Sequence, residues 1–229
     1  MLHKWLEIAS TPSVKAAREH YGSAVQYARL DGTLDRAGPV RNDRLGQAES
    51  EFISGRDGFY LASVSETGWP YVQYRGGPGG FLRVLDDHTL GFADFRGNRQ
   101  YVTTGNVAEN DRVSLFLMDY AHQRRLKIFG HLRMIDVSAD PELLATLAVP
   151  DYAARSERAA LIRVEAFDWN CPQHITPRFT EAEISQAFAP IRAHLMQLEA
   201  ENGTLRAKLA AQENDDGSRT TATPTLHHG

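Results

Sequence analysis

The densest group of side chains that could do chemistry lies between Asp94 and Gln100, a stretch that contains Arg96, Asn98 and Arg99. It follows a predicted strand, and we expect it to open a helix. Backbone N–H groups at a helix start, the helix dipole and guanidinium groups all favour a bound dianion. Because arginine at a helix start is otherwise unfavourable, the pattern favours a phosphate site. An exposed turn with solvated arginines is the open alternative.

A second group of polar side chains comes earlier, where Gln73 and Arg75 alternate with apolar residues in a predicted strand. Side chains two apart in a strand share a face, so both are predicted to point toward one ligand. The run Gly76-Gly77-Pro78-Gly79-Gly80 follows, and glycine lets a flat ring lie close to the backbone. A solvated polar stripe on the surface is the alternative.

Several classes of site are not expected. The nine histidines lack paired metal-ligand spacing and there is one cysteine, so we predict neither a metal site nor an internal disulfide. No nucleophile elbow, P-loop or dinucleotide fingerprint is present. Cys171 is interpreted as a buried structural thiol rather than a nucleophile, although His174 lies three residues away. A net charge of −4 argues against a general nucleic-acid binder.

Short strands with few helices between them must position these groups. The predicted strands cover residues 58–65, 70–75, 81–85, 89–93, 112–119, 125–137 and 159–169. The predicted helices cover 12–21 with Ser13 as N-cap, 45–55, 98–107 and a short stretch opened by Asp140-Pro141, while 31–43 is predicted to be a loop. Six or seven strands joined in this way favour an antiparallel barrel over a parallel sheet.

The C-terminal region carries a different pattern. Two sets of residues, each spaced by seven and offset by four, form an a/d heptad pattern: Phe188, Leu195, Asn202 and Leu209 at a, and Ile184, Ile191, Leu198 and Leu205 at d. The signature Thr180-x-x-Glu183 predicts a capping box at its start. A lone Asn at an a position is typical of a parallel pair, with Glu201 and Arg206 attracting across it. Packing of the stripe on the protein's own domain is the alternative.

The ordered series of motifs resembles the pyridoxamine 5'-phosphate oxidase-like family of FMN-binding split barrels, in the branch of oxidase-related proteins. The motifs are the turn 66–71, the Gln73-x-Arg75-Gly-Gly strand, the segment 92–100 and the strands 111–116 and 126–130. The likeness covers about residues 45 to 175. It implies a mainly β (α+β) fold: a six-stranded antiparallel split β-barrel with flanking helices, to which the heptads add a coiled-coil-like helix.

The resemblance also implies a homodimer with FMN in a groove between the subunits. By that similarity the cofactor-binding residues are Gln73, Tyr74, Arg75, Gly76, Ala93, Asp94, Arg96, Asn98, Arg99, Gln100, Arg125 and Trp169. The first four would contact flavin or ribityl. Arg125 falls where the oxidases present a polar side chain from the partner subunit. Trp169 would either cover the ring or lie in the core.

The chain departs from the authentic oxidases at several positions. Gln100 replaces a lysine of their phosphate motif, a charge that Arg96 can restore, and Pro78 replaces the lysine that reaches substrate phosphate. Their terminal Arg-Leu-Ala-Pro-like segment is absent. Vitamin B6 oxidation is therefore not expected. His174 is the one weak candidate for an acid or base.

The expected function is an FMN-dependent oxidoreductase that transfers hydride or electrons to a small molecule whose identity the sequence does not give. The alternatives are a non-enzymatic flavin-binding or redox-partner module and a split barrel that binds deazaflavin or haem. We expect a helical arm at 1–44, the barrel at 45–178, a helix at 179–212 and a disordered tail at 213–229. No targeting or membrane segment is predicted, so a cytoplasmic protein without nucleic-acid partners is expected.

Overall fold

The computed structural model describes residues 3–30 and 41–220, with side chains described as far as residue 212. Most of the loop predicted at 31–43 therefore lies outside the described residues. The chain divides into two compact units, Met1–Pro177 and Arg178–Gly229.

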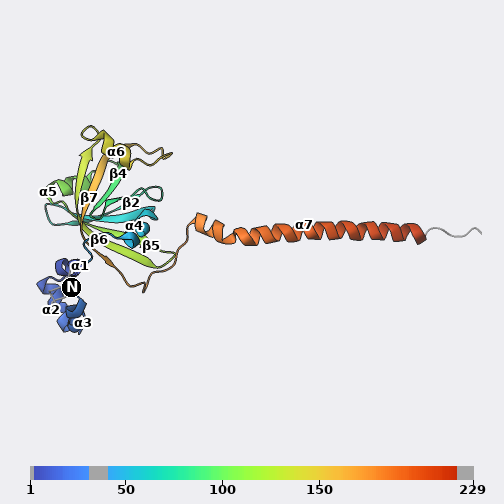
Figure 1. Cartoon of the computed structure of the whole chain (residues 1–229), viewed down its shortest axis with the longest axis horizontal. Coiled ribbons are helices and arrows are strands. Elements are labelled where there is room, and N and C mark those ends of the chain that lie inside the picture. The colour runs from blue at the N-terminus through green and yellow to red at the C-terminus, as the bar shows by residue number, and fades with distance from the viewer. Residues whose placement is uncertain (1–2, 31–40, 221–229) are drawn as a thin grey trace, which may run out of the picture. The chain divides into compact units, whose positions relative to one another are not determined.

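The first unit is built on one antiparallel sheet of seven strands (Figure 1). The strands are β1 (Gly58–Val64), β2 (Pro70–Gly76), β3 (Arg83–Asp86), β4 (Thr89–Phe95), β5 (Arg112–Asp119), β6 (Arg124–Asp136) and β7 (Ser156–Trp169). Their order across the sheet is β2-β1-β5-β6-β7-β4-β3. The two outermost strands, β2 and β3, do not pair with each other, so the sheet is not closed.

The seven strands agree with the seven strand ranges predicted from the sequence and correct the six-stranded barrel that the family resemblance implied. The additional strand is β3, which is four residues long and pairs with β4 through a tight hairpin, with a register shift between Val84 and Asp86. The sequence predicted this strand at 81–85, and the structure has it at Arg83–Asp86. The other strands fall close to their predicted positions.

The core lies on the inner face of the sheet, where alternate residues of neighbouring strands meet. Leu115 of β5 is opposite Ile128 of β6, and Leu117 is opposite Leu126. All four side chains are fully buried. Burial of alternate residues is what a strand with one core-facing side requires.

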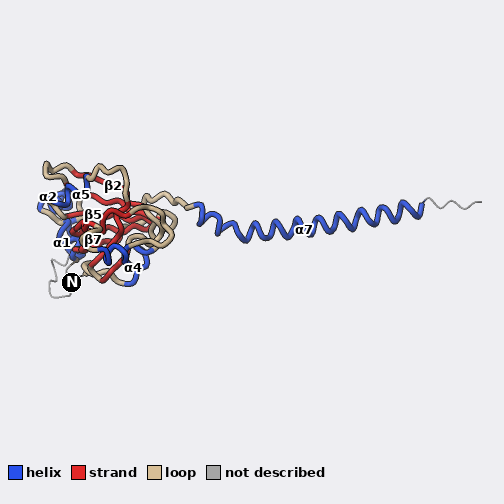
Figure 2. The backbone as a smooth tube through the Cα atoms, turned by 90° about the horizontal axis from the view of Figure 1, so that it is seen from above, coloured by secondary structure: helices blue, strands red, loops and turns tan. Residues whose placement is uncertain are grey.

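Helices lie around the sheet (Figure 2). They are α1 (Lys4–Ala9), α2 (Pro12–His20), α3 (Ala24–Leu30), α4 (Gln47–Ser54), α5 (Val102–Glu109) and α6 (Pro141–Leu147). α1 covers the outer face of β6 through Trp5, whose ring stacks on Phe129 at 3.8 Å between centroids. α4 adds Phe52 and Ile53 to the core.

Three details of the helices differ from the sequence prediction. Thr11, not Ser13, caps α2, because Pro12 occupies the first helical position and the Thr11 hydroxyl accepts from the Val14 N–H. Helices α1 and α3 were not predicted; they have six and seven residues. The third difference is the start of α5, which begins at Val102 instead of residue 98.

The second unit contains one long helix, α7 (Glu181–Thr220). The predicted capping box is confirmed: Glu183 accepts from the Thr180 N–H at 2.7 Å, and the Thr180 hydroxyl accepts from the Glu183 N–H at 3.2 Å. The helix continues through residues 213–220, where a disordered tail was expected, and 221–229 lie outside the described residues. Among the described helices, none is long and apolar enough to cross a membrane.

Candidate functional site

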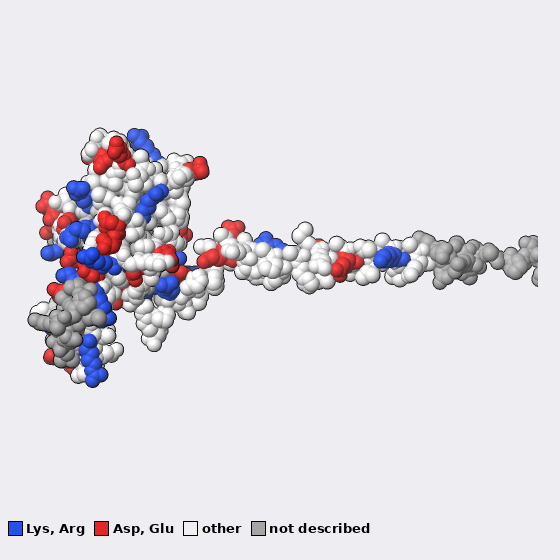
Figure 3. Space-filling model, in the orientation of Figure 1, with Lys and Arg blue, Asp and Glu red and all other residues white. Residues whose placement is uncertain are grey.

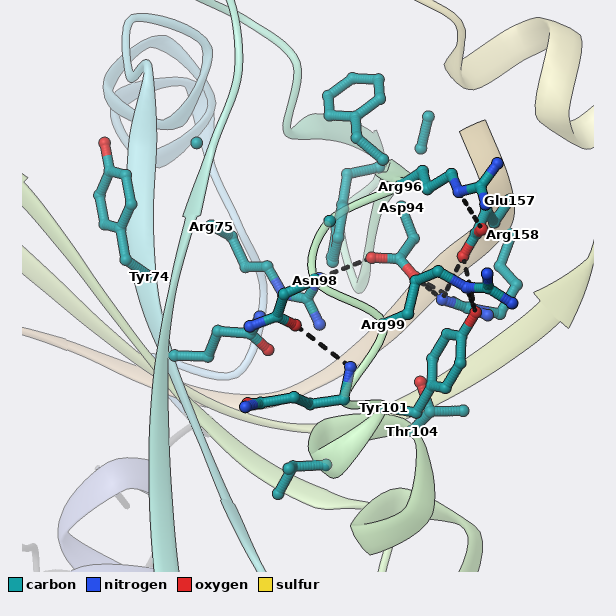
Figure 4. A pocket seen from close by; sticks show the side chains of 18 of the residues that line it. Tyr74, Arg75, Asp94, Arg96, Asn98, Arg99, Tyr101, Thr104, Glu157 and Arg158 are labelled. Carbon is teal, nitrogen blue, oxygen red and sulfur yellow. Dashed lines mark hydrogen bonds and ion pairs between the residues drawn. The ribbon is translucent and has the colours of Figure 1, made fainter. Parts of the chain in front are cut away.

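A cavity of about 240 Å³ opens between β2 and β4, on the side of the barrel where the sheet fails to close. Its remaining walls come from the loop after β4, the first turn of α5 and the start of β7 (Figure 4). Ten of the predicted cofactor residues line it: Gln73, Tyr74, Arg75, Gly76, Ala93, Asp94, Arg96, Asn98, Arg99 and Gln100. The two polar groups singled out in the sequence, from β2 and from the stretch after β4, therefore face one space.

An ion-pair cluster crosses the gap between β2 and β4 at the inner end of this cavity. The Arg75 Nη1 of β2 donates to one Asp94 oxygen at 2.6 Å. From β7, Arg158 donates to the other Asp94 oxygen through Nε at 2.9 Å and Nη2 at 2.6 Å. Asp94 and Arg158 are directly opposite in the β4–β7 register. The Asp94 carboxylate thus joins β2, β4 and β7, although β2 pairs with neither of the other two strands.

Asp94 is almost inaccessible, with 3% of its side chain exposed. Both of its oxygens are occupied by guanidinium groups, which is the arrangement a buried carboxylate needs to remain charged. For Arg158, burial disfavours the charged form, but the hydrogen bonds and the charge of Asp94 outweigh it and raise the pKa. We interpret Asp94 as the residue that positions Arg75 and Arg158, rather than as a direct ligand contact.

The outer end of the cavity carries two arginines that are held only loosely. Arg96 is 43% exposed, and its Nε lies 3.5 Å from Glu157. Arg99 is exposed and donates from Nε to the Tyr101 hydroxyl at 3.1 Å, and that hydroxyl donates in turn to Glu157 at 3.4 Å. The hydrogen bond to Tyr101 is the main cause of a raised Arg99 pKa. Since a guanidinium has five N–H groups, both side chains retain donors for a ligand.

The helix predicted from residue 98 begins later, because the backbone on its approach is not helical. Arg99 and Tyr101 both have positive φ, 61° and 54°, and α5 starts at Val102. The segment 96–101 is therefore a loop that leads into the helix. Hydrogen bonds from Thr103 to Gln73 and from Asn106 to Ser63 fix α5 against β2 and β1. The first turn of α5 still lines the cavity, through Val102 and Thr104.

The β2 strand carries an unsatisfied donor on the cavity side, and the Tyr74 ring lies beside Gly76 and points away from the other labelled residues of the cavity (Figure 4). Burial, with help from the charge of Asp57, raises the pKa of Tyr74, so its hydroxyl stays protonated at neutral pH. A side chain at Gly76 would collide with the Tyr74 ring, which a Cβ would approach to 2.9 Å. The Arg75 Nε is buried and has no hydrogen-bond partner among the described residues. Such an atom is costly unless a ligand or water accepts from it.

The charge balance of the cavity is positive. Arginines 75, 96, 99 and 158 are partly offset by Asp94 and Glu157. Asp94 and Glu157 both lie toward the β7 side, and each already accepts from at least one arginine. The excess of guanidinium groups over carboxylates favours an anion.

Three sequence-predicted residues lie elsewhere in the same chain. Trp169 donates from its indole to Glu49 at 2.8 Å and packs edge-on against Phe52. Arg125 is at the start of β6, half-buried, with an Nε that has no partner in the described part of the chain. His174 is exposed, in the segment after β7, with a φ of 63°. None of the three lines this cavity.

Sequence reasoning missed Arg158, Glu157 and Tyr101. The first two enter the site only because the start of β7 pairs with the end of β4. Their signal was the charged Glu157-Arg158 pair at the start of a strand whose other residues are mostly apolar. Tyr101 follows directly after the arginine segment and was taken as part of the helix.

Comparison with known proteins supports one family. A family model described as pyridoxamine 5'-phosphate oxidase matches residues 45–170, which is more than half of the chain. No curated protein matches. The match begins at Leu45, just before α4, and ends just after β7, so it contains every strand and every residue of the cavity wall.

Among solved structures, similar ones include HupZ from Group A Streptococcus, with 16% identity and a TM-score of 0.46 over 59% of this chain and 99% of that chain. An FMN-binding protein from Syntrophomonas wolfei has 11% identity and a TM-score of 0.44 over 69% and 97%. An F420 reductase has 18% identity and a TM-score of 0.39 over 54% and 98%.

Proposed function

Because the chain belongs to the pyridoxamine 5'-phosphate oxidase-like family of flavin-binding split barrels, we propose that it binds FMN in the cavity between β2 and β4 and uses it for oxidoreduction of a small molecule. The observation that carries the proposal is the pairing of two kinds of donor in one cavity. Exposed arginines lie at its outer end, and a buried, unsatisfied arginine nitrogen lies on its β2 wall.

The outer end suits the terminal phosphate of FMN. Arg96 and Arg99 approach from one loop, Asn98 lies between them and the first turn of α5 follows. Guanidinium groups bind phosphate through paired N–H groups, and a helix start adds unpaired backbone N–H groups. Glutamine at position 100, where the oxidases have lysine, leaves the loop with two arginines as its cationic groups.

The β2 wall suits the flavin ring. The unpartnered Arg75 Nε offers a hydrogen bond to an acceptor on the ring edge, and the Asp94 ion pair fixes the plane of that guanidinium. Gly76 lines the same wall, and the space that its Cβ would fill is taken by the Tyr74 ring. The residues present therefore fit FMN at both ends.

A second copy of the chain is part of the proposal. The cavity of one chain, about 240 Å³, is smaller than the roughly 300 to 1,000 Å³ of pockets that enclose a drug-sized ligand. The outer face of β1 and β2 exposes Tyr60, Val72 and Tyr74. We propose that this apolar face contacts the partner and that Arg125, with its unpartnered Nε, reaches the cofactor of the other subunit.

When bound, the flavin would supply hydride or electron transfer, and the protein would supply position and charge. Arg75 would hold the ring edge, and the Arg96 to Arg99 loop would anchor the phosphate. No side chain is assigned as a catalytic base, since flavin chemistry does not require one and His174 lies outside the cavity. A flavin-binding module without a substrate of its own is the competing function.

The experiment has two stages. Heat-released ligand from the purified protein is first identified by mass and absorbance, and FMN is the expected result. Release of deazaflavin or haem, or no uptake of FMN by the ligand-free protein, would exclude the proposal. The bound flavin is then mixed with NADH or NADPH in stopped flow and reoxidised by a panel of acceptors. Rapid reduction supports an oxidoreductase, and an inert flavin supports the binding module.

A further inference from the structure

The second unit exposes an apolar stripe along α7. The residues at the a and d positions, other than Asn202, are Ile184, Phe188, Ile191, Leu195, Leu198, Leu205 and Leu209, and each is between 45% and 64% exposed. In the described part of this unit, 178–220, α7 is the only helix or strand. Figure 3 shows the visible face of the helix as largely uncharged, with charged side chains in separate groups. A stripe of this length needs a partner surface.

The spacing of the stripe specifies the shape of that partner. Apolar residues that repeat every 3.5 positions stay in line only if two helices supercoil around each other. The stripe runs from residue 184 to 209, about 38 Å of helix at 1.5 Å per residue. Pro190 falls at a c position and interrupts the first heptad, because a proline inside a helix removes a backbone hydrogen bond and kinks the helix. The regular stripe therefore runs from Ile191 to Leu209, about 27 Å of helix.

Asn202 limits the choice of partner. It is the one polar residue at an a position, with Leu198 and Leu205 on either side of it in the stripe. Against an apolar surface of the barrel its amide would be buried without a partner, which is unfavourable. In a parallel, in-register pair the two Asn202 amides face each other and can hydrogen-bond.

The flanking charges point to the same partner. In the heptad register Glu201 is at g and Arg206 is at the next e, while His194 and Glu199 hold the same positions one heptad earlier. Residues five apart are not neighbours on one helix, where contacts join residues three or four apart. In a parallel pair, however, g contacts the next e of the other chain. Both combinations place a carboxylate opposite a basic side chain.

We propose that α7 pairs with α7 of a second copy of this chain, parallel and in register, over residues 191–209. This contact is separate from the one between barrels and does not depend on flavin. It gives the dimer a second, independent attachment. The apolar stripe of α7 therefore packs against the same stripe of a second copy, and not against the barrel or an unrelated protein.

Disulfide trapping in the full-length protein tests the arrangement. Cys171, which the sequence predicted to be a buried thiol, is exposed and is first replaced by Ser. Ile191→Cys and Leu205→Cys are then made as two separate proteins, each with a single cysteine at a d position. A parallel, in-register pair places each cysteine beside its own copy, within disulfide reach. Both variants should therefore cross-link on mild oxidation, and Ala200→Cys, at the outward f position, should not.

Every other result counts against the proposal. An antiparallel pair brings a positions opposite d positions, so cross-linking of Ile191→Cys with Leu209→Cys, and of neither protein with itself, would show an antiparallel pair. Equal cross-linking of Ala200→Cys would show nearness without a paired stripe. No cross-linking at all would show that α7 does not pair with a second α7, and that the barrel or a different partner covers the stripe. Flavin content measured on the same samples separates these outcomes from failure of the proposed function.

Charge reversal gives a second test with a built-in rescue. Glu201→Lys or Arg206→Glu alone places like charges across the pair, and each should slow cross-linking of the Ile191→Cys protein several-fold. The double change Glu201→Lys with Arg206→Glu should restore it. If the double variant is as slow as the singles, the g-to-e contact does not form.

Discussion

The two ends of the cavity use arginine in opposite ways. At the inner end, Arg75 and Arg158 are mostly buried and share one carboxylate, Asp94, at 2.6 to 2.9 Å. At the outer end, Arg96 and Arg99 are exposed, and their nearest polar partners lie at 3.1 to 3.5 Å. Arginine thus holds the structure together at the inner end and keeps N–H groups available for a ligand at the outer end.

The difference follows from the cost of burying charge. A buried guanidinium must be paired, so the inner arginines commit most of their donors to Asp94 and hold β2, β4 and β7 together. Exposed guanidinium groups keep their water and lose little when a ligand displaces it. We therefore expect changes at the inner end to act mainly on stability and changes at the outer end to act mainly on ligand affinity.

Removal of the shared carboxylate should have the largest effect. Asp94→Ala leaves two arginines without their partner in a buried place, and the free energy of unfolding should fall by about 3 to 5 kcal/mol. Chemical denaturation measures it. Asp87→Ala is the matched control, because Asp87 pairs with Arg44 at an exposed position and should change stability by at most about 1 kcal/mol. Similar losses of stability in both variants would show that the ion-pair cluster of Asp94 with Arg75 and Arg158 does not hold β2 and β4 together.

Arg158→Ala should have the next largest effect. It removes two charged hydrogen bonds to Asp94 and a longer one to Glu157 but leaves Asp94 paired with Arg75, so we expect a loss of about 1.5 to 3 kcal/mol of stability. The matched outer variant, Arg99→Ala, should stay within about 0.5 kcal/mol of the original protein. Thermal unfolding of the two variants side by side tests the contrast. If Arg99→Ala loses more stability than Arg158→Ala, the inner arginines do not stabilise the fold more than the outer ones.

Tyr101→Phe should have the smallest effect. The change removes the hydroxyl that links Arg99 to Glu157 and leaves the ring in place. Arg99 then has more freedom, and FMN affinity should fall by about 0.5 to 1 kcal/mol with stability almost unchanged. Fluorescence titration of the ligand-free protein measures it. A loss as large as that of Arg99→Ala would instead make Tyr101 a direct contact.

The part of the site that could be predicted comes from local sequence. Gln73 and Arg75 share a face because strands alternate, and Arg96, Asn98 and Arg99 come from one continuous segment. Their family resemblance then placed the two segments near one cofactor. The start of α5 could not be read in this way, because positive φ at Arg99 and Tyr101 depends on contacts that the sequence pattern does not display.

The ion-pair cluster of Arg75, Asp94 and Arg158 could not be predicted, since it depends on strand register. Asp94 meets Arg158 only because β7 pairs with β4, and Arg75 only because the open sheet curls until β2 approaches β4. In α7, by contrast, the heptad spacing and the capping box are local, and the sequence indicated both the helix and its start.

The most direct test of the contrast compares two flavins in one titration series. FMN and riboflavin differ only by the phosphate, so the ratio of their affinities isolates the outer end of the cavity. Arg99→Ala should weaken FMN by about 1.5 to 3 kcal/mol, roughly 10- to 140-fold, and leave riboflavin binding unchanged. If both flavins weaken equally, or if neither does, Arg99 does not hold the phosphate and the proposed division of the cavity is wrong.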